Sequence, residues 1–230
     1  MNVRPNITRR GFTLLEFMFV IVALAVLAAL LLPGYARRHA RSSKIGCVNN
    51  LKQVGLSFRQ WAQDNGDKFP MQTPVTNGGT MELVGSGNVF VHFLVMSNEI
   101  NVPKILICPE ESNPKRQAAT TFASVLSPGA LNSVPFTNDN NVSYFVGVDA
   151  VDTSPQMFLV GDDNLTIRGV RVKRGILSIW TNTPVAWTRD RHVNQGNICL
   201  ADGSVQGFNN QTLARAFQST GVITNRLAMP

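Results

Sequence analysis

Glu16 is a single carboxylate in an otherwise apolar stretch of this chain. It is the only ionisable side chain between Phe12 and Leu32. Inside a membrane, a carboxylate near the centre of a helix costs roughly 2.5–3.5 kcal/mol, and one that stays there usually has a partner. The stretch supplies no cation of its own. A buried carboxylate needs a cationic partner, so we expect that of Glu16 to come from outside this stretch.

The apolar stretch must form a helix for Glu16 to be placed in this way. Its twenty-one residues, Phe12–Leu32, would make a helix of about 31 Å, which matches the ~30 Å hydrocarbon core of a membrane. A secretory signal peptide is one alternative, but its small-residue site, Ala23-Leu24-Ala25, lies inside the run rather than at its end. A plain membrane anchor is the other alternative, and it does not explain why Gly11 and Glu16 flank the start.

The residues around the start of the stretch resemble a known processing site. Arg9 and Arg10 precede the sequence Gly11-Phe12-Thr13-Leu14-Leu15-Glu16, which is similar to the cleavage site of type IV prepilins and type II secretion pseudopilins. The resemblance implies that a prepilin peptidase cuts between Gly11 and Phe12 and methylates the new amino group of Phe12. It also implies that Glu16 pairs with this amine in a neighbouring subunit and so directs assembly.

A second resemblance covers most of the rest of the chain. The segments Cys47–Gln53 and Asp64–Pro70, and the pair Cys108-Pro109, are similar to a pilin-like family of planctomycete- and verrucomicrobium-type bacteria. In that family His192 and the pair Asp202-Gly203 would form the C-terminal signature. This resemblance implies a fold and a class of assembly, and it implies no particular cargo.

The chain divides into four expected parts. Residues 1–11 are a cytoplasmic leader that is cleaved, 12–32 a transmembrane or filament-core helix, 33–65 its amphipathic continuation, and 66–230 an extracytoplasmic globular α+β domain. The continuation is indicated by apolar residues at every third or fourth position from Ile45 to Trp61, and Gly66 predicts its end. We expect an α+β, pilin-like fold in which one long N-terminal helix packs on a C-terminal antiparallel sheet.

Alternating apolar runs predict the strands of that sheet. They are Val142–Val148, Met157–Val160, Thr166–Val172 and Ile176–Trp180, and the last two are expected to pair as a hairpin. A second hairpin is expected around Asp202-Gly203, since both turn positions of this dipeptide favour positive φ. A terminal helix is expected with its cap near Asn210. Val89–Val95 fits a strand or a buried helix equally well.

Three cysteines bear on compartment and on metal binding: Cys47, Cys108 and Cys199. An oxidising compartment permits a disulfide, and the sequence leaves its pairing open. The chain has no Cys-x-x-Cys, so a zinc ribbon is not expected. Calcium is the alternative, with the oxygen ligands Asp162, Asp163 and Asp202, but these carboxylates lack a calcium-loop spacing. We therefore expect no metal and no other cofactor.

The chain carries no motif of a known catalytic class, so we expect it not to be an enzyme. His192 fits a structural hydrogen bond, with Asp202 as one partner. The net charge is +7, but most of the excess lies in the leader and directly after the apolar stretch. The domain is therefore close to neutral, which argues against nucleic-acid binding.

The sequence predicts a subunit of a type IV pilus or of a type II secretion pseudopilus. The resemblance implies several partners: the prepilin peptidase, other pilin or pseudopilin subunits, membrane lipid, and an inner-membrane assembly platform with a cytoplasmic ATPase. It implies a single-pass precursor in the bacterial inner membrane with its domain outside the cytoplasm. The alternative is a processed, membrane-tethered binding or surface protein that does not polymerise.

Overall fold

The computed structural model describes residues 13–123 and 133–230, and for residues 31–41 it describes the backbone alone. The first helix, α1 (Leu14–Asp64), is 51 residues long. The chain divides into two compact units, Met1–Ser42 and Ser43–Pro230, so α1 contributes residues to both. The predicted cleavage and methylation positions, Gly11 and Phe12, lie outside the described residues.

The predicted membrane span is wrong for the part of the chain that the structure describes. None of the helices in that part is long and apolar enough to cross a membrane. The fold is α+β with a C-terminal antiparallel sheet, without the membrane-spanning half expected of its first helix.

A six-stranded antiparallel sheet organises the Ser43–Pro230 unit, with the strand order β5-β9-β1-β2-β7-β8. Its strands are β1 (Tyr144–Gly147), β2 (Phe158–Asp162), β5 (Gly175–Trp180), β7 (Gln195–Leu200), β8 (Val205–Asn209) and β9 (Thr224–Met229). A smaller sheet has the order β4-β3-β6. Its strands are β3 (Leu165–Ile167), β4 (Val170–Arg171) and β6 (Val185–Trp187).

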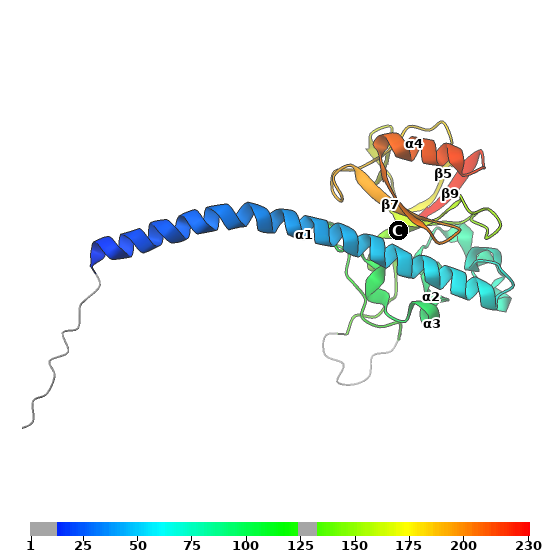
Figure 1. Ribbon diagram of the computed structural model, residues 1–230. Coiled ribbons are helices and arrows are strands. Elements are labelled where there is room, and N and C mark those ends of the chain that lie inside the picture. Colours follow the sequence, from blue (N-terminus) through cyan, green and yellow to red (C-terminus); the bar gives the residue numbers. More distant parts are fainter. Residues whose placement is uncertain (1–12, 124–132) are drawn as a thin grey trace, which may run out of the picture. The chain divides into compact units, whose positions relative to one another are not determined.

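The large sheet is covered on both faces. Because successive side chains of a strand point to opposite sides, each strand contributes residues to the core on either face. In β1, Val146 joins the core that contains Leu51 and Phe58 of α1. Its neighbour Phe145 joins a second core, which contains Phe217 of α4 (Asn210–Ser219). Figure 1 shows α1 and α4 on opposite sides of the sheet. Each of these buried side chains contributes about 1.5–3 kcal/mol relative to exposure.

Short helices fill the segment between α1 and the sheet. They are η1 (Pro70–Gln72), η2 (Val75–Asn77), η3 (Met81–Ser86), α2 (Phe90–Leu94), α3 (Ser97–Ile100), η4 (Pro103–Leu106) and η5 (Asp139–Asn141). The segment Val89–Val95, for which strand and helix were both open, is therefore helical at its centre. Its residues Phe93 and Val89 are fully buried in the core on the α1 side of the sheet.

The hairpin predicted at Asp202-Gly203 is confirmed, but its turn type is not. Strands β7 and β8 pair from Gln195↔Asn209 to Cys199↔Val205. Of the two turn residues only Gly203 is left-handed, with φ 84°. The backbone N–H of Leu200 donates to the carbonyl of Ser204 at 2.9 Å, so the loop has three residues, one more than the two-residue turn that was expected. The predicted terminal helix is also present, and its cap is Asn209, whose side chain accepts hydrogen bonds from the backbone of Gln211 and Thr212.

The predicted hairpin between Thr166–Val172 and Ile176–Trp180 is wrong. A tight turn at Arg168 and Gly169, with φ 51° and 78°, folds the first of these runs back on itself. It becomes β3 and β4 in the small sheet, whereas β5 pairs with β9 in the large one. The partner of β5 is β9, a strand that was not predicted from the sequence.

Candidate functional site

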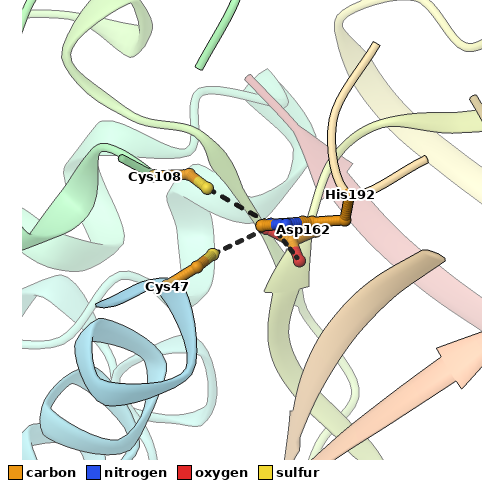
Figure 2. Close-up of side chains that lie close together, drawn as sticks. All are labelled: Cys47, Cys108, Asp162 and His192. Carbon is orange, nitrogen blue, oxygen red and sulfur yellow. Dashed lines mark hydrogen bonds and ion pairs between the residues drawn. The ribbon is translucent and has the colours of Figure 1, made fainter. Parts of the chain in front are cut away.

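The structure brings four side chains from distant segments together inside the Ser43–Pro230 unit, as Figure 2 shows. They are Cys47, Cys108, Asp162 and His192, and we call them the four-residue cluster. One potential ligand atom from each lies within 4.8 Å of all the others. All four residues are buried, with exposed fractions between 0% and 5%.

Each member of the cluster comes from a different element. Cys47 lies on α1, one turn before Leu51 on the face that packs on the sheet. Cys108 follows η4, and Asp162 is the last residue of β2. His192 lies in the loop that leads into β7.

The loop that carries His192 has an unusual backbone. His192, Val193 and Asn194 have φ of 52°, 48° and 59°. Positive φ is uncommon for residues other than glycine, and for a β-branched residue such as Val193 it is a genuine outlier. Such strained residues persist only where the surrounding structure holds them, and they concentrate at functional sites. The strained backbone of this loop directs the His192 ring into the interior of the Ser43–Pro230 unit.

The distances within the cluster are short. The sulfur of Cys47 lies 3.3 Å from Oδ1 of Asp162. The sulfur of Cys108 lies 3.4 Å from Nε2 of His192, and this nitrogen lies 3.6 Å from Oδ2 of Asp162. Figure 2 shows the two sulfurs converging on the carboxylate and the imidazole. The arrangement supplies two sulfur ligands, one nitrogen ligand and one oxygen ligand around a common centre.

A second layer of polar groups orients the cluster. Asn197 donates hydrogen bonds to Oδ2 of Asp162 from its backbone N–H at 2.7 Å and from Nδ2 at 3.0 Å. Oε2 of Glu110 lies 2.9 Å from Nδ1 of His192 and accepts a hydrogen bond from the His192 backbone N–H at 3.0 Å. The Tyr144 hydroxyl lies 3.7 Å from the sulfur of Cys47. The imidazole is thus flanked by a carboxylate on each side.

The two thiols have very different affinities for a proton. A hydrogen bond with Cys47 lowers the pKa of Cys108 to about 6, against the effect of burial and with help from His192. The same hydrogen bond, together with burial and the charge of Asp162, raises the pKa of Cys47. Of the two thiols, Cys108 is therefore the one that loses its proton more readily. A thiolate is the form in which cysteine binds a metal or acts as a nucleophile.

Next to the cluster lies a buried group of four charged side chains. Arg191 and Arg116 each form ion pairs with Glu111 and Asp163, and the Glu111 pairs measure 3.3 Å and 3.1 Å. Burial alone would lower the pKa of Arg191, but the charges of Asp162 and Glu111 outweigh it and raise this pKa. Arg191 therefore stays positively charged beside the cluster.

The structure separates the three residues that were considered for calcium. Asp162 lies in the four-residue cluster, Asp163 pairs with two arginines, and Asp202 lies in the β7–β8 turn. Of the three, only Asp162 belongs to a group of potential ligands within the described part of the chain. This group holds one carboxylate and two sulfurs, whereas calcium requires six to eight oxygen ligands.

The other contacts that the sequence suggested are also formed between different residues. The carboxylates beside His192 are Asp162 and Glu110, whereas Asp202 accepts a hydrogen bond from the backbone of Ser204 at 2.8 Å. All three cysteines are free and buried, and Cys199 is not part of the cluster. Sequence reasoning missed the cluster because its members share no short motif. The only signal was that two cysteines and a histidine each lay in a segment with a family resemblance.

The predicted assembly residue, Glu16, has a local role in the structure. Its Oε2 accepts hydrogen bonds from the backbone N–H and from the hydroxyl of Thr13, both at 2.9 Å. The Glu16 backbone N–H donates in turn to the Thr13 hydroxyl at 3.3 Å. This reciprocal pattern is a capping box at the start of α1.

Comparisons of the chain with protein-family models, with curated proteins and with solved structures find no match. Function must therefore be inferred from the residues of the chain itself. Two features carry chemical information: the exposed apolar start of α1 with Glu16, and the buried four-residue cluster.

Proposed function

We propose that this chain is a pilin-like or pseudopilin-like subunit that is processed by a prepilin peptidase. It then assembles through the N-terminal part of α1 into a filament of the type IV pilus or type II secretion pseudopilus class. The observation that carries the proposal is the exposed apolar surface of α1 directly after a sequence that resembles a prepilin cleavage site.

Every described residue from Thr13 to Leu30 is exposed. The large apolar side chains among them expose between 45% and 80% of their surface. A helix that is apolar on all sides must be covered by other apolar surface. A second copy of the same helix supplies such a surface, and repeated contacts of this kind build a filament.

Glu16 gives this packing a register. It is the only charged side chain between Thr13 and Leu30. Cleavage after Gly11 would create a positively charged amine at Phe12, and Glu16 of a neighbouring copy would meet it in an apolar surrounding. A charge-assisted hydrogen bond of this kind is about twice as strong as a neutral one. Copies shifted along the axis would leave both charges unpaired, which is costly.

The proposal implies three kinds of partner. They are a prepilin peptidase, other copies or related subunits, and an assembly platform driven by a cytoplasmic ATPase. It also places the Ser43–Pro230 unit outside the cytoplasm, where filament subunits of this class present their globular domains.

The first test is the processing step. The full chain is co-expressed with a prepilin peptidase, and its N-terminus is determined by intact mass and sequencing. The proposal expects a chain that starts at N-methylated Phe12, and a Gly11→Val variant that keeps its leader. A chain that retains residues 1–11 beside an active peptidase would overturn the proposal.

The second test separates assembly from simple tethering. All three native cysteines are buried, so a Leu24→Cys variant places one exposed thiol on the apolar part of α1. Disulfide cross-links between copies at this position are expected in assembled material. If processed chains form no such cross-links, the alternative of a tethered surface protein that does not polymerise is favoured instead.

A further inference from the structure

We propose that the four-residue cluster binds one zinc ion as a structural metal site. All four residues belong to the Ser43–Pro230 unit, so the site does not depend on the proposed assembly through the N-terminal part of α1.

The ligand types and their spacing fit zinc. Zinc in structural sites is tetrahedral and takes Cys sulfur at ~2.3 Å, His nitrogen at ~2.0 Å and carboxylate oxygen at about 2.0–2.2 Å. Two ligand atoms of such a tetrahedron lie roughly 3.3–3.8 Å apart. The three contacts around Asp162, His192 and the two sulfurs measure 3.3, 3.4 and 3.6 Å. The other pairs of ligand atoms lie within 4.8 Å of one another, so they would need to close by at most about 1 Å to surround an ion.

The charges also fit a divalent cation. With both thiols deprotonated, the two sulfurs and Asp162 would place three negative charges in a fully buried volume. Buried charges without compensation cost several kcal/mol each. A zinc ion removes two of the three, and the guanidinium of Arg191, which is 2% exposed, supports the remaining one.

The second layer has the form that metal sites require. A histidine that binds a metal almost always gives its other ring nitrogen to a carboxylate or carbonyl group. Here Nε2 of His192 faces the cluster, and Oε2 of Glu110 lies 2.9 Å from Nδ1 without hydrogen-bond geometry, so a small rotation of the side chains would complete this contact. The carboxylate of Asp162 is fixed by two hydrogen bonds from Asn197. Asp162 is thus oriented by hydrogen bonds to its carboxylate, whereas His192 is held through its backbone N–H, which donates to Glu110 at 3.0 Å.

Two other uses of the thiols fit less well. Catalytic cysteines sit in partially exposed surroundings, whereas Cys108 is 1% exposed and Cys47 is fully buried. The sulfurs of a disulfide between Cys47 and Cys108 would be weak hydrogen-bond partners. Such a bond would therefore leave both Asp162 and the imidazole of His192 without a strong partner. Four buried ligands without an open position are typical of structural zinc.

Zinc at this point would connect the parts of the unit. It would join α1 through Cys47, the end of β2 through Asp162, and the segments that carry Cys108 and His192. The last two segments have little regular structure of their own. The ion would therefore hold loops that hydrogen bonds between strands do not fix, and it would offset the backbone strain at His192.

The experiment uses the full chain, without a histidine tag, in a mild detergent that covers the apolar side chains of α1. Metal content is measured by mass spectrometry, with about one zinc per chain as the expected result. The metal is then removed with a chelator and replaced by cobalt(II). We expect the visible absorption of tetrahedral cobalt together with sulfur-to-cobalt charge transfer.

Three variants and one control locate the site. Cys108→Ser and Asp162→Asn should lower zinc affinity at least about tenfold, and Glu110→Gln should lower it by about 10- to 100-fold through the orientation of His192. Cys199→Ser is the matched control, because it removes a buried thiol outside the cluster. It should keep both the zinc content and the cobalt spectrum.

A readout on the unmutated chain guards against variants that do not fold. The thermal midpoint of the chelator-treated chain should rise when zinc chloride is added, and it should not respond to magnesium. The proposal is overturned if the chain binds no zinc, or if cobalt binds without sulfur charge transfer. Peptide mapping that shows a disulfide between Cys47 and Cys108 in the purified protein would overturn it as well.

Discussion

The Nε2 atom of His192 lies 3.4 Å from the sulfur of Cys108, although 84 residues separate the two in the sequence. The contact exists because the chain turns through three consecutive left-handed residues, from His192 to Asn194, just before β7 begins. It brings a histidine and a cysteine from two segments far apart in the sequence to one point of the fold.

Glu16 caps α1 and, in the proposed filament, also pairs with the amine of a neighbour, and two substitutions separate these roles. Glu16→Gln keeps an acceptor for the capping box with Thr13 and removes the charge, whereas Glu16→Ala removes both. If Glu16 pairs with the amine of a neighbour, both variants should lose assembly. A charged hydrogen bond of about 1.5–3 kcal/mol corresponds to a roughly 10- to 100-fold loss in association.

Filament yield from processed chains, measured by sedimentation, gives the answer. Processing itself should be unchanged in both variants, which serves as the internal control. If Glu16→Gln assembles normally while Glu16→Ala does not, then the residue matters as a helix cap and the proposed pairing is wrong.

His92 should make the protein less stable in mild acid. It is fully buried, its Nδ1 lies 2.7 Å from the hydroxyl of Thr80, and burial lowers its pKa to about 4. Above pH 6.5 the folded and unfolded chains both carry the neutral ring. As the pH falls from about 6.5 to about 4, the unfolded chain takes up the proton first. The free energy of unfolding should therefore fall by up to about 3 kcal/mol over this window.

A His92→Gln variant isolates this contribution. His192 has a raised pKa, despite its burial, because of the hydrogen bond with Cys108, so its effect on stability has the opposite sign. This effect of His192 is present in the unmutated protein and in the His92→Gln variant, so it cancels when the two are compared. Urea unfolding between pH 7 and 4.5, followed by tryptophan fluorescence, should show a smaller loss for the variant. Parallel curves for the two proteins would contradict a buried, neutral His92.

Local patterns in the sequence predicted part of the Ser43–Pro230 unit. The helical spacing of Leu51, Val54, Phe58 and Trp61 correctly marked the face of α1 that is buried. Ile45 was placed on the same face but is 53% exposed. The pairing of β5 with β9 could not be predicted, because strands far apart in the sequence find each other through the shape of the whole core and leave no short signal.

The four-residue cluster could not be predicted for a related reason. Metal motifs are readable when ligands sit a few residues apart on one element, as in Cys-x-x-Cys. Here each ligand comes from a separate element, and the position of Asp162 depends on the register of β2 against β7. The chemistry of the residues was visible in the sequence, but their proximity was a property of the fold.

Gly203 should be more sensitive to substitution than another glycine of the same hairpin. Its φ of 84° is left-handed, where a side chain costs roughly 1–2 kcal/mol. Gly203→Ala should lower the free energy of unfolding by that amount. Gly207, in β8, is the control: a Cβ there would meet only Oδ1 of Asn197, at 3.5 Å. Gly207→Ala should be neutral or slightly stabilising, and equal losses in urea unfolding for both variants would contradict the assigned turn.

Gly55 and Cys199 should be coupled through a direct contact between α1 and β7. A Cβ on Gly55 would lie 2.3 Å from the sulfur of Cys199, which is far too close. Alanine in a helix is intrinsically better than glycine by about 0.5–1 kcal/mol, but overpacking a core costs about 1–3 kcal/mol. Gly55→Ala should therefore be destabilising by about 1–2 kcal/mol overall, in contrast to the usual effect of this substitution in a helix.

A double-mutant cycle tests whether the sulfur is the cause. Cys199→Ala removes the atom that the new methyl group would meet, so the double variant should be more stable than the sum of the two single changes predicts. Because the residues touch, a coupling energy above about 0.5 kcal/mol is expected. Additive effects would mean that α1 does not approach β7 as closely as the structure shows. A positive coupling would instead identify Cys199 as a packing residue of the α1–sheet contact, with a role separate from that of the two clustered cysteines.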